Sequence, residues 1–89
     1  MKKITLTAAD WKTPQDAHRA LKEALSFPEY YGNNLDALYD VLTEIGQETE
    51  IILTEPAAVV RQMGKYGEAL LATMQEAAEN NPRLIVKLQ

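Results

Sequence analysis

The sequence predicts an α/β fold with two layers, in which helices pack against a three-stranded parallel sheet. Three short apolar segments of β type, at residues 4–6, 51–53 and 84–88, are separated by segments whose apolar residues recur at helical spacing. The order is strand, helix, helix, strand, helix, helix, strand. Helical crossovers join parallel strands, and right-handed crossovers between strands lying in sequence order place every helix on one face. No linker divides the chain, so we expect a single domain over residues 1–89.

The first strand and the first helix are marked by alternation and by a helix start. Ile4 and Leu6 alternate with polar residues, which indicates a strand with one buried face. Thr13 and Pro14 begin a helix, because a hydroxyl N-cap followed by proline is a typical start. This helix ends before Pro28, since the residue that precedes a proline is pushed out of the α region.

The second helix is predicted to begin after an N-cap at Asn33 or Asn34 and to end at Gly46. Five residues form its apolar side: Leu35, Leu38, Val41, Leu42 and Ile45.

The second half of the chain repeats the pattern. Residues 51–53 are continuously apolar, as expected of a central strand covered on both faces. Pro56 opens a short helix that stops near Gly64, and a longer helix follows over residues 66–80. The last strand occupies residues 84–88.

Composition limits the partners and the chemistry of this chain. With 13 acidic and 9 basic residues the formal net charge is -4, which disfavours nucleic acid or an anionic membrane as partner and favours a basic protein. The absence of cysteine excludes disulfides, thiolate metal ligands and a cysteine nucleophile. No apolar run approaches the roughly 20 residues that cross a bilayer. We expect a cytoplasmic protein without a cofactor or metal.

One face of the second helix carries acids without bases. Asp36, Asp40 and Glu44 follow one another at four-residue spacing, so they share a helical face opposite the apolar side. Like charges at this spacing destabilise a helix by about 0.2–0.5 kcal/mol per pair. We interpret the face as a contact surface whose compensating positive charge belongs to another molecule. Glu76 in the last helix also lacks a basic neighbour. Taken alone, each acid has an ordinary alternative: Asp36 as an acid stabilised by the dipole near the helix N-terminus, and Asp40 and Glu76 as solvated surface residues.

Tyrosines accompany these acids. Tyr39 lies between the acidic face and the apolar side, where it either contacts a partner or covers the edge of the core. Of the adjacent Tyr30 and Tyr31, we expect one to pack and the other to present its ring outward. Gly32 either supplies a positive φ or lets a partner approach the backbone closely.

The sequence argues against an enzyme. Paired carboxylates act as general acid and base only when they sit in different environments, and exposed acids on one helical face do not. The single histidine, His18, is expected to pack at the boundary of the first helix. No serine nucleophile motif or phosphate-binding loop is found. A small hydrolase that uses Asp36 and Asp40 is therefore the weakest alternative.

Residues 28–43 follow the pattern Pro-Glu-Tyr-Tyr-Gly-x-Asn-Leu-Asp-Ala-Leu-x-Asp-x-Leu-Thr. This pattern closely resembles the barstar family, which are bacterial intracellular inhibitors of barnase-type ribonucleases, and the similarity extends over the full chain. The resemblance implies a three-stranded parallel sheet with helices packed against it. It also implies a 1:1 complex with a basic ribonuclease, whose active site the second helix and the preceding loop would block. The carboxylates would stand in for RNA phosphates.

The resemblance further implies which residues bind. Asp40 matches the aspartate that enters the catalytic phosphate pocket, Asp36 matches a second charged contact, and Glu76 matches the acid of the last helix. The contact positions around them are Tyr30, Gly32, Asn34, Leu35, Tyr39 and Thr43, with Ile45 near the rim and Tyr31 and Thr73 at the margin. Tyr39 and Ile45 stand where the best-known member has tryptophan, and Asn33 and Asn80 replace acids of that pattern. The sequence therefore does not identify which ribonuclease this protein would inhibit. The alternative function is a non-inhibitory acidic module that docks another basic protein.

Overall fold

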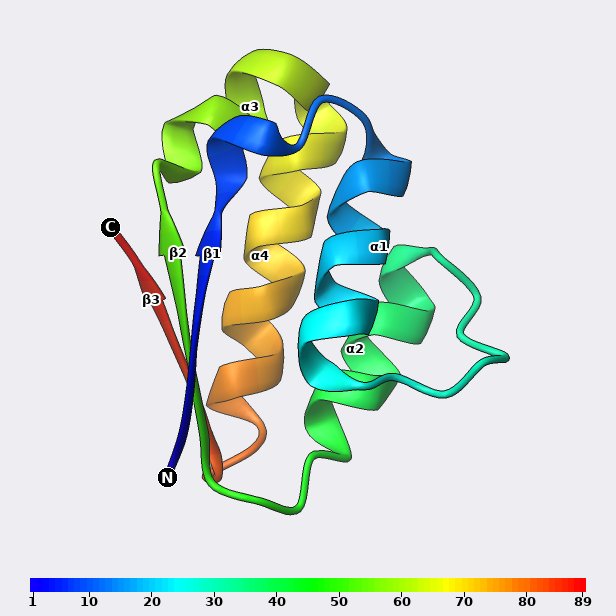
Figure 1. Ribbon diagram of the computed structural model, residues 1–89, viewed down its shortest axis with the longest axis vertical. Coiled ribbons are helices and arrows are strands. Elements are labelled where there is room, and N and C mark those ends of the chain that lie inside the picture. Colours follow the sequence, from blue (N-terminus) through cyan, green and yellow to red (C-terminus); the bar gives the residue numbers. More distant parts are fainter.

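The computed structural model describes all 89 residues and has the predicted architecture (Figure 1). Strands β1 (Lys2–Thr7), β2 (Thr49–Thr54) and β3 (Leu84–Leu88) form one parallel sheet in the order β1-β2-β3. Figure 1 shows the strands on one side and the helices on the other, so the sheet and the helices make two layers. The predicted α/β class and element order are confirmed. A short 3-10 turn, η1 (Ala8–Asp10), is an addition that the sequence pattern did not predict.

Four helices form the second layer: α1 (Pro14–Leu25), α2 (Leu35–Thr43), α3 (Pro56–Met63) and α4 (Lys65–Glu79). Helix α4 packs against β3, α2 and α3, and it therefore lies at the centre of the helical layer. Its buried residues join the core together with buried residues of α1, α2 and β2. The helix that is predicted to carry the acids thus rests directly on α4.

Helices cover only one face of the central strand. Ile51 and Leu53 are fully buried beneath the helices, whereas Ile52 points to the opposite face, beside Thr5 and Lys87 of the neighbouring strands, and is half-buried. The prediction that residues 51–53 are covered on both faces is wrong. Both crossovers lie on the same side of the sheet, so the second face is covered only by side chains of the adjacent strands.

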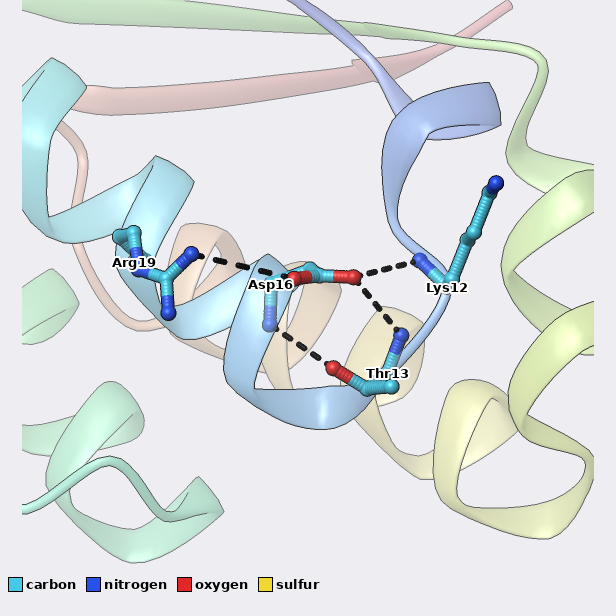
Figure 2. Close-up of polar contacts among 4 residues, drawn as sticks. All are labelled: Lys12, Thr13, Asp16 and Arg19. Atoms are coloured by element: carbon cyan, nitrogen blue, oxygen red, sulfur yellow. Dashed lines mark hydrogen bonds and ion pairs between the residues drawn. The ribbon is translucent and has the colours of Figure 1, made fainter.

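Helix α1 begins as predicted, with a capping box at Thr13 (Figure 2). Thr13 Oγ1 accepts a hydrogen bond from the Asp16 backbone N–H at 3.2 Å, and Asp16 Oδ2 accepts from the Thr13 N–H at 3.2 Å. The Lys12 N–H also donates to Asp16 Oδ2 at 3.0 Å, and the Arg19 guanidinium lies 4.0 Å from the other carboxylate oxygen. Asp16 is therefore an acid that the fold itself uses.

His18 is a core residue, and the prediction of a boundary position is wrong. Its side chain is 1 % exposed. Imidazole Nδ1 lies 2.6 Å from the Tyr31 hydroxyl, and Nε2 lies 2.7 Å from the Tyr66 hydroxyl. A polar ring is tolerated in a core when its polar atoms find hydrogen-bond partners there, and two tyrosines supply them.

Helix α2 ends earlier than predicted and without the glycine cap. The helix stops at Thr43, and Gly46 lies beyond it without a positive φ. The carbonyls of Leu42 and Ile45 each accept a hydrogen bond of 3.0 Å from the Asn81 side-chain amide. In a C-terminal glycine motif, backbone N–H groups just beyond the helix would bond the last carbonyls. Here the Asn81 side chain, from the turn before β3, bonds them instead.

Candidate protein-binding site

The loop before α2 is closed by an asparagine cap. Asn34 Oδ1 accepts a hydrogen bond from the Ala37 N–H at 2.8 Å, so Asn34 is the N-cap among the two predicted candidates. Its amide nitrogen donates to the Gly32 carbonyl at 3.2 Å. The positive φ of this loop belongs to Asn33, at 53°, and not to Gly32, so that explanation for the glycine is wrong. A Cβ on Gly32 would come within 3.0 Å of the Asn34 amide, which indicates that the missing side chain makes room for the cap.

Of the two adjacent tyrosines one is buried and the other is exposed, as predicted. Tyr31 is 6 % exposed and packs on Phe27 with ring centroids 4.9 Å apart. Tyr30 is 86 % exposed. A large aromatic side chain with this exposure covers nothing in its own fold, so its apolar ring is free for contact with another molecule.

The acids of the predicted site have no partner inside the protein. Asp36, Asp40, Glu44 and Glu76 are all exposed, and none of their carboxylates takes part in an ion pair or in a side-chain hydrogen bond. The three ion pairs of the structure join other residues, and Asp16 shows how this fold engages an acid that it does use. The carboxylates on α2 and α4 are therefore uncompensated.

The position of Asp40 within α2 makes its charge unfavourable. Because the helix ends at Thr43, Asp40 lies in the last turn, where the helix dipole is negative and no basic residue is present. An anion at a helix C-terminus is destabilising by about 0.3–1 kcal/mol. Asp36 lies in the first turn, where the same dipole favours it. The acidic face thus includes one acid that helps its helix and one that weakens it.

A shallow hollow brings the loop and the helix together. Tyr30 and Gly32 line it from the loop, and Asp40 and Glu44 line it from α2. Two carboxylates beside an aromatic ring suit a lysine or arginine side chain, which can pair with the acids and lie against the ring. The structure therefore brings together the predicted site residues Tyr30, Gly32 and Asp40.

A second contact joins α2 to the end of α4. The Tyr39 hydroxyl accepts a hydrogen bond of 2.8 Å from the Asn80 side-chain amide, which also donates to the Glu76 carbonyl at 3.1 Å. Tyr39 is half-buried, so its ring covers the edge of the core while its hydroxyl is fixed at the surface. This link places Tyr39 beside the turn of α4 that carries Glu76. The role of Asn80 was missed because nothing in the spacing of residues 39 and 80 indicates their contact.

The remaining predicted site residues are less available for contact with a partner, because their side chains are hydrogen-bonded within the fold or packed against the core. Thr43 donates its hydroxyl to the carbonyls of Tyr39 and Asp40, at 2.9 and 3.0 Å, and Thr73 donates to the Ala69 carbonyl at 2.8 Å. Their hydroxyl oxygens can only accept from a partner while these bonds last. Leu35 and Ile45 are half-buried and pack against the core, Ile45 from a position beyond the end of α2.

No three side chains among histidine, aspartate and glutamate gather where they could hold a metal ion. None of the helices is both long and apolar enough to span a membrane.

A parallel α/β fold that displays uncompensated carboxylates on one helix is suited to binding a basic protein. The family model described as "Barstar (barnase inhibitor)" matches residues 1–89, and the chain therefore belongs to the barstar family. A protein of Bacillus subtilis (strain 168) named "Putative ribonuclease inhibitor YrdF" is 36% identical to it over 80 residues, which are 89% of this chain and 88% of that protein. The resemblance carried by residues 28–43 is thus confirmed at the level of the family.

Proposed function

We propose that this protein is a cytoplasmic inhibitor of a barnase-type ribonuclease and forms a 1:1 complex with it. Helix α2 and residues 28–34 would enter the enzyme's active site and exclude RNA. The observation that carries the proposal is the set of carboxylates, those of Asp36, Asp40 and Glu76, which are exposed and have no cation within their own fold.

The carboxylates act as substitutes for phosphate groups. A ribonuclease holds the RNA backbone with basic side chains, and arginine binds carboxylates and phosphates through the same paired hydrogen bonds. Asp36 and Asp40 are separated by one turn, about 6 Å along the helix axis, so two different cations can each meet one carboxylate. Because the acids are not engaged internally, binding breaks no ion pair of the inhibitor.

Aromatic and backbone contacts surround the charges. Tyr30 presents its exposed ring on one side of the hollow, and Tyr39 lies on the α4 side with its hydroxyl fixed by Asn80. Tyrosine is enriched among residues that dominate binding energy, because a rigid ring buries much area at a low entropy cost. Gly32 is exposed and lets the enzyme approach the loop backbone. We propose that Asn34, Leu35, Thr43, Ile45 and Thr73 complete the rim.

Charge complementarity also governs the rate of association. A net charge of -4 attracts a basic enzyme over distance, which raises the association rate at low salt. At about 0.15 M ionic strength exposed charges are screened beyond roughly 8 Å, so association should slow as salt is added.

Titration of a barnase-type ribonuclease with this protein tests the proposal. RNA cleavage should fall linearly with added protein and reach its minimum at one equivalent. The variant Glu23→Ala, which removes an exposed acid on α1, should give the same end point. Stable binding that leaves cleavage intact would support the non-inhibitory module instead, and the absence of binding to any enzyme of this type would contradict the proposal.

A further inference from the structure

The loop between α1 and α2 has few attachments to the fold. Within residues 28–34 only Tyr31 is buried, while Tyr30, Gly32 and Asn34 are exposed. The loop also contains one residue with a positive φ, Asn33, and its ion pair joins Lys22 to the fully exposed Glu29 at 3.7 Å. An exposed pair of this kind contributes little, so apart from the Asn34 cap at its end, the loop is held to the fold by Tyr31, through the packing of its ring on Phe27 and through its hydroxyl.

Tyr31 is held by a hydrogen-bond network, centred on the buried His18 ring, that joins the loop to α1 and α4. Its hydroxyl lies 2.6 Å from Nδ1 of His18 on α1, and the other ring nitrogen of His18 lies 2.7 Å from the hydroxyl of Tyr66 on α4. The rings also pack, with centroids 5.6 Å apart for His18 and Tyr31 and 6.2 Å apart for His18 and Tyr66. No buried side-chain nitrogen or oxygen is left without a partner.

The network is complete only with both tyrosines. Burial lowers the pKa of His18, so the imidazole is neutral at pH 7 and has one donor and one acceptor nitrogen. Burial raises the pKa of Tyr31, with a further contribution from Tyr66, and burial also raises the pKa of Tyr66, so both hydroxyls keep their protons. One tyrosine therefore donates to the imidazole while the other accepts from it. Removal of either hydroxyl leaves a buried ring nitrogen unpaired.

We propose that His18 and Tyr66 are positioning residues, which hold Tyr31 and thereby fix residues 28–34 in the conformation that presents Tyr30 and Gly32 to the partner. The consequence for inhibition rests on the proposed function, whereas the effect on the loop does not. Tyr66 lies in the first turn of α4, ten residues before Glu76, which corresponds to about 15 Å along the helix. Tyr66 is not among the residues of the proposed contact surface, and it would affect binding through His18 and Tyr31. An inhibitor with a loosened loop must order that loop on binding, which lowers its affinity.

The variant Tyr66→Phe tests this inference because it keeps the ring and removes one hydroxyl. The first readout is amide hydrogen exchange in the free protein at Tyr31, whose N–H donates to the Pro28 carbonyl at 3.0 Å. Loss of the hydrogen bond between the Tyr66 hydroxyl and the buried His18 ring should speed this exchange about tenfold, the factor that corresponds to about 1.4 kcal/mol. Tyr31→Phe removes the same network from its other end and should speed the exchange similarly. The second readout is the inhibition constant, which Tyr66→Phe should raise about three- to tenfold for the same reason.

The control is Thr49→Val in β2, a strand outside the loop and the helices that hold it. This substitution removes the hydroxyl of a buried residue, which donates to the Gln47 carbonyl at 2.8 Å. Its Tyr31 exchange and its inhibition constant should match those of the parent protein. Exchange at Tyr31 that is no faster in Tyr66→Phe than in Thr49→Val would overturn the inference, and so would faster exchange with unchanged inhibition. If the parent inhibits no ribonuclease, the proposed function fails, while the exchange measurement still decides whether the network holds the loop.

Discussion

Replacing Asp40 by asparagine should make the free protein more stable. Asp40 is exposed, engages no cation and lies in the last turn of α2, between Asp36 and Glu44 on the same helical face. The substitution keeps the size and approximate helix propensity of the side chain and removes only the charge. If the Asp40 carboxylate stabilised the fold, its removal would lower the free energy of unfolding. The sign of the change in the free energy of unfolding therefore distinguishes the two cases.

The size of the effect follows from three unfavourable interactions. Two like-charge contacts at four-residue spacing, with Asp36 and with Glu44, cost about 0.2–0.5 kcal/mol each. The negative end of the helix dipole adds about 0.3–1 kcal/mol at low salt. We therefore expect Asp40→Asn to raise the free energy of unfolding by about 1 kcal/mol, which for a chain of this length is an increase in Tm of about 4–8 °C. Salt should reduce the gain, since exposed charges are screened.

Urea unfolding followed by circular dichroism, at low and high salt, measures this change. The control Asp36→Asn should be close to neutral, because relief of one repulsion is offset by the lost dipole interaction in the first turn. If Asp40→Asn lowers the free energy of unfolding by 1 kcal/mol or more, its carboxylate serves the fold, and the reasoning is refuted.

Three further predictions concern the fold around the site. Gly67→Ala should destabilise the protein by about 1–3 kcal/mol in urea unfolding, because the new Cβ would clash with the Val59 carbonyl oxygen. Gly46→Ala, whose Cβ would meet nothing within 4 Å, should leave the stability unchanged, and equal effects of the two substitutions would contradict this prediction. Asn81→Ala should cost about 2–3 kcal/mol in the same assay, because the buried amide makes three hydrogen bonds at the end of α2 and before β3, and a loss below 0.5 kcal/mol would argue against it. Neutral His18 should contribute fully to the free energy of unfolding above pH 6.5, and this contribution should be lost as the pH falls below 6.5. The reason is that burial lowers the pKa of His18 in the folded state, so the unfolded chain binds the proton first. A urea midpoint that is higher at pH 5.5 than at pH 7 would be inconsistent with this.

Local signals predicted most of the fold. The start of α1 at Thr13 and Pro14 was predictable because a capping box and a proline act within four residues, and the element order followed from apolar periodicity. Errors arose where distant residues decide. The end of α2 depends on Asn81, some forty residues away, and the burial of His18 depends on Tyr66, 48 residues away. Neither contact leaves a mark in the local sequence.

The candidate site was predictable to a similar degree. The acidic face of α2 follows from the spacing of Asp36 and Asp40 and from the absence of nearby bases, and the structure shows that no base reaches these acids from elsewhere. The individual binding roles came from family resemblance, since spacing alone does not distinguish a contact residue from a solvated one. The link between Tyr39 and Asn80 required the packing of α2 on α4.

The affinity of Asp40→Ala for a responsive ribonuclease, compared with that of Glu23→Ala, tests the central claim most directly. Both variants remove one exposed acid, so they change net charge equally, but only Asp40 lies on the proposed contact surface. Truncating one partner of a buried charge pair costs about 2–5 kcal/mol or more in known interfaces, the barnase–barstar complex among the systems measured, and we expect a loss of this order for Asp40→Ala. Glu23→Ala should bind within about threefold of the parent, as is usual for a charge outside the contact surface. An Asp40→Ala variant that inhibits as tightly as the parent would contradict the claim that this carboxylate replaces an RNA phosphate.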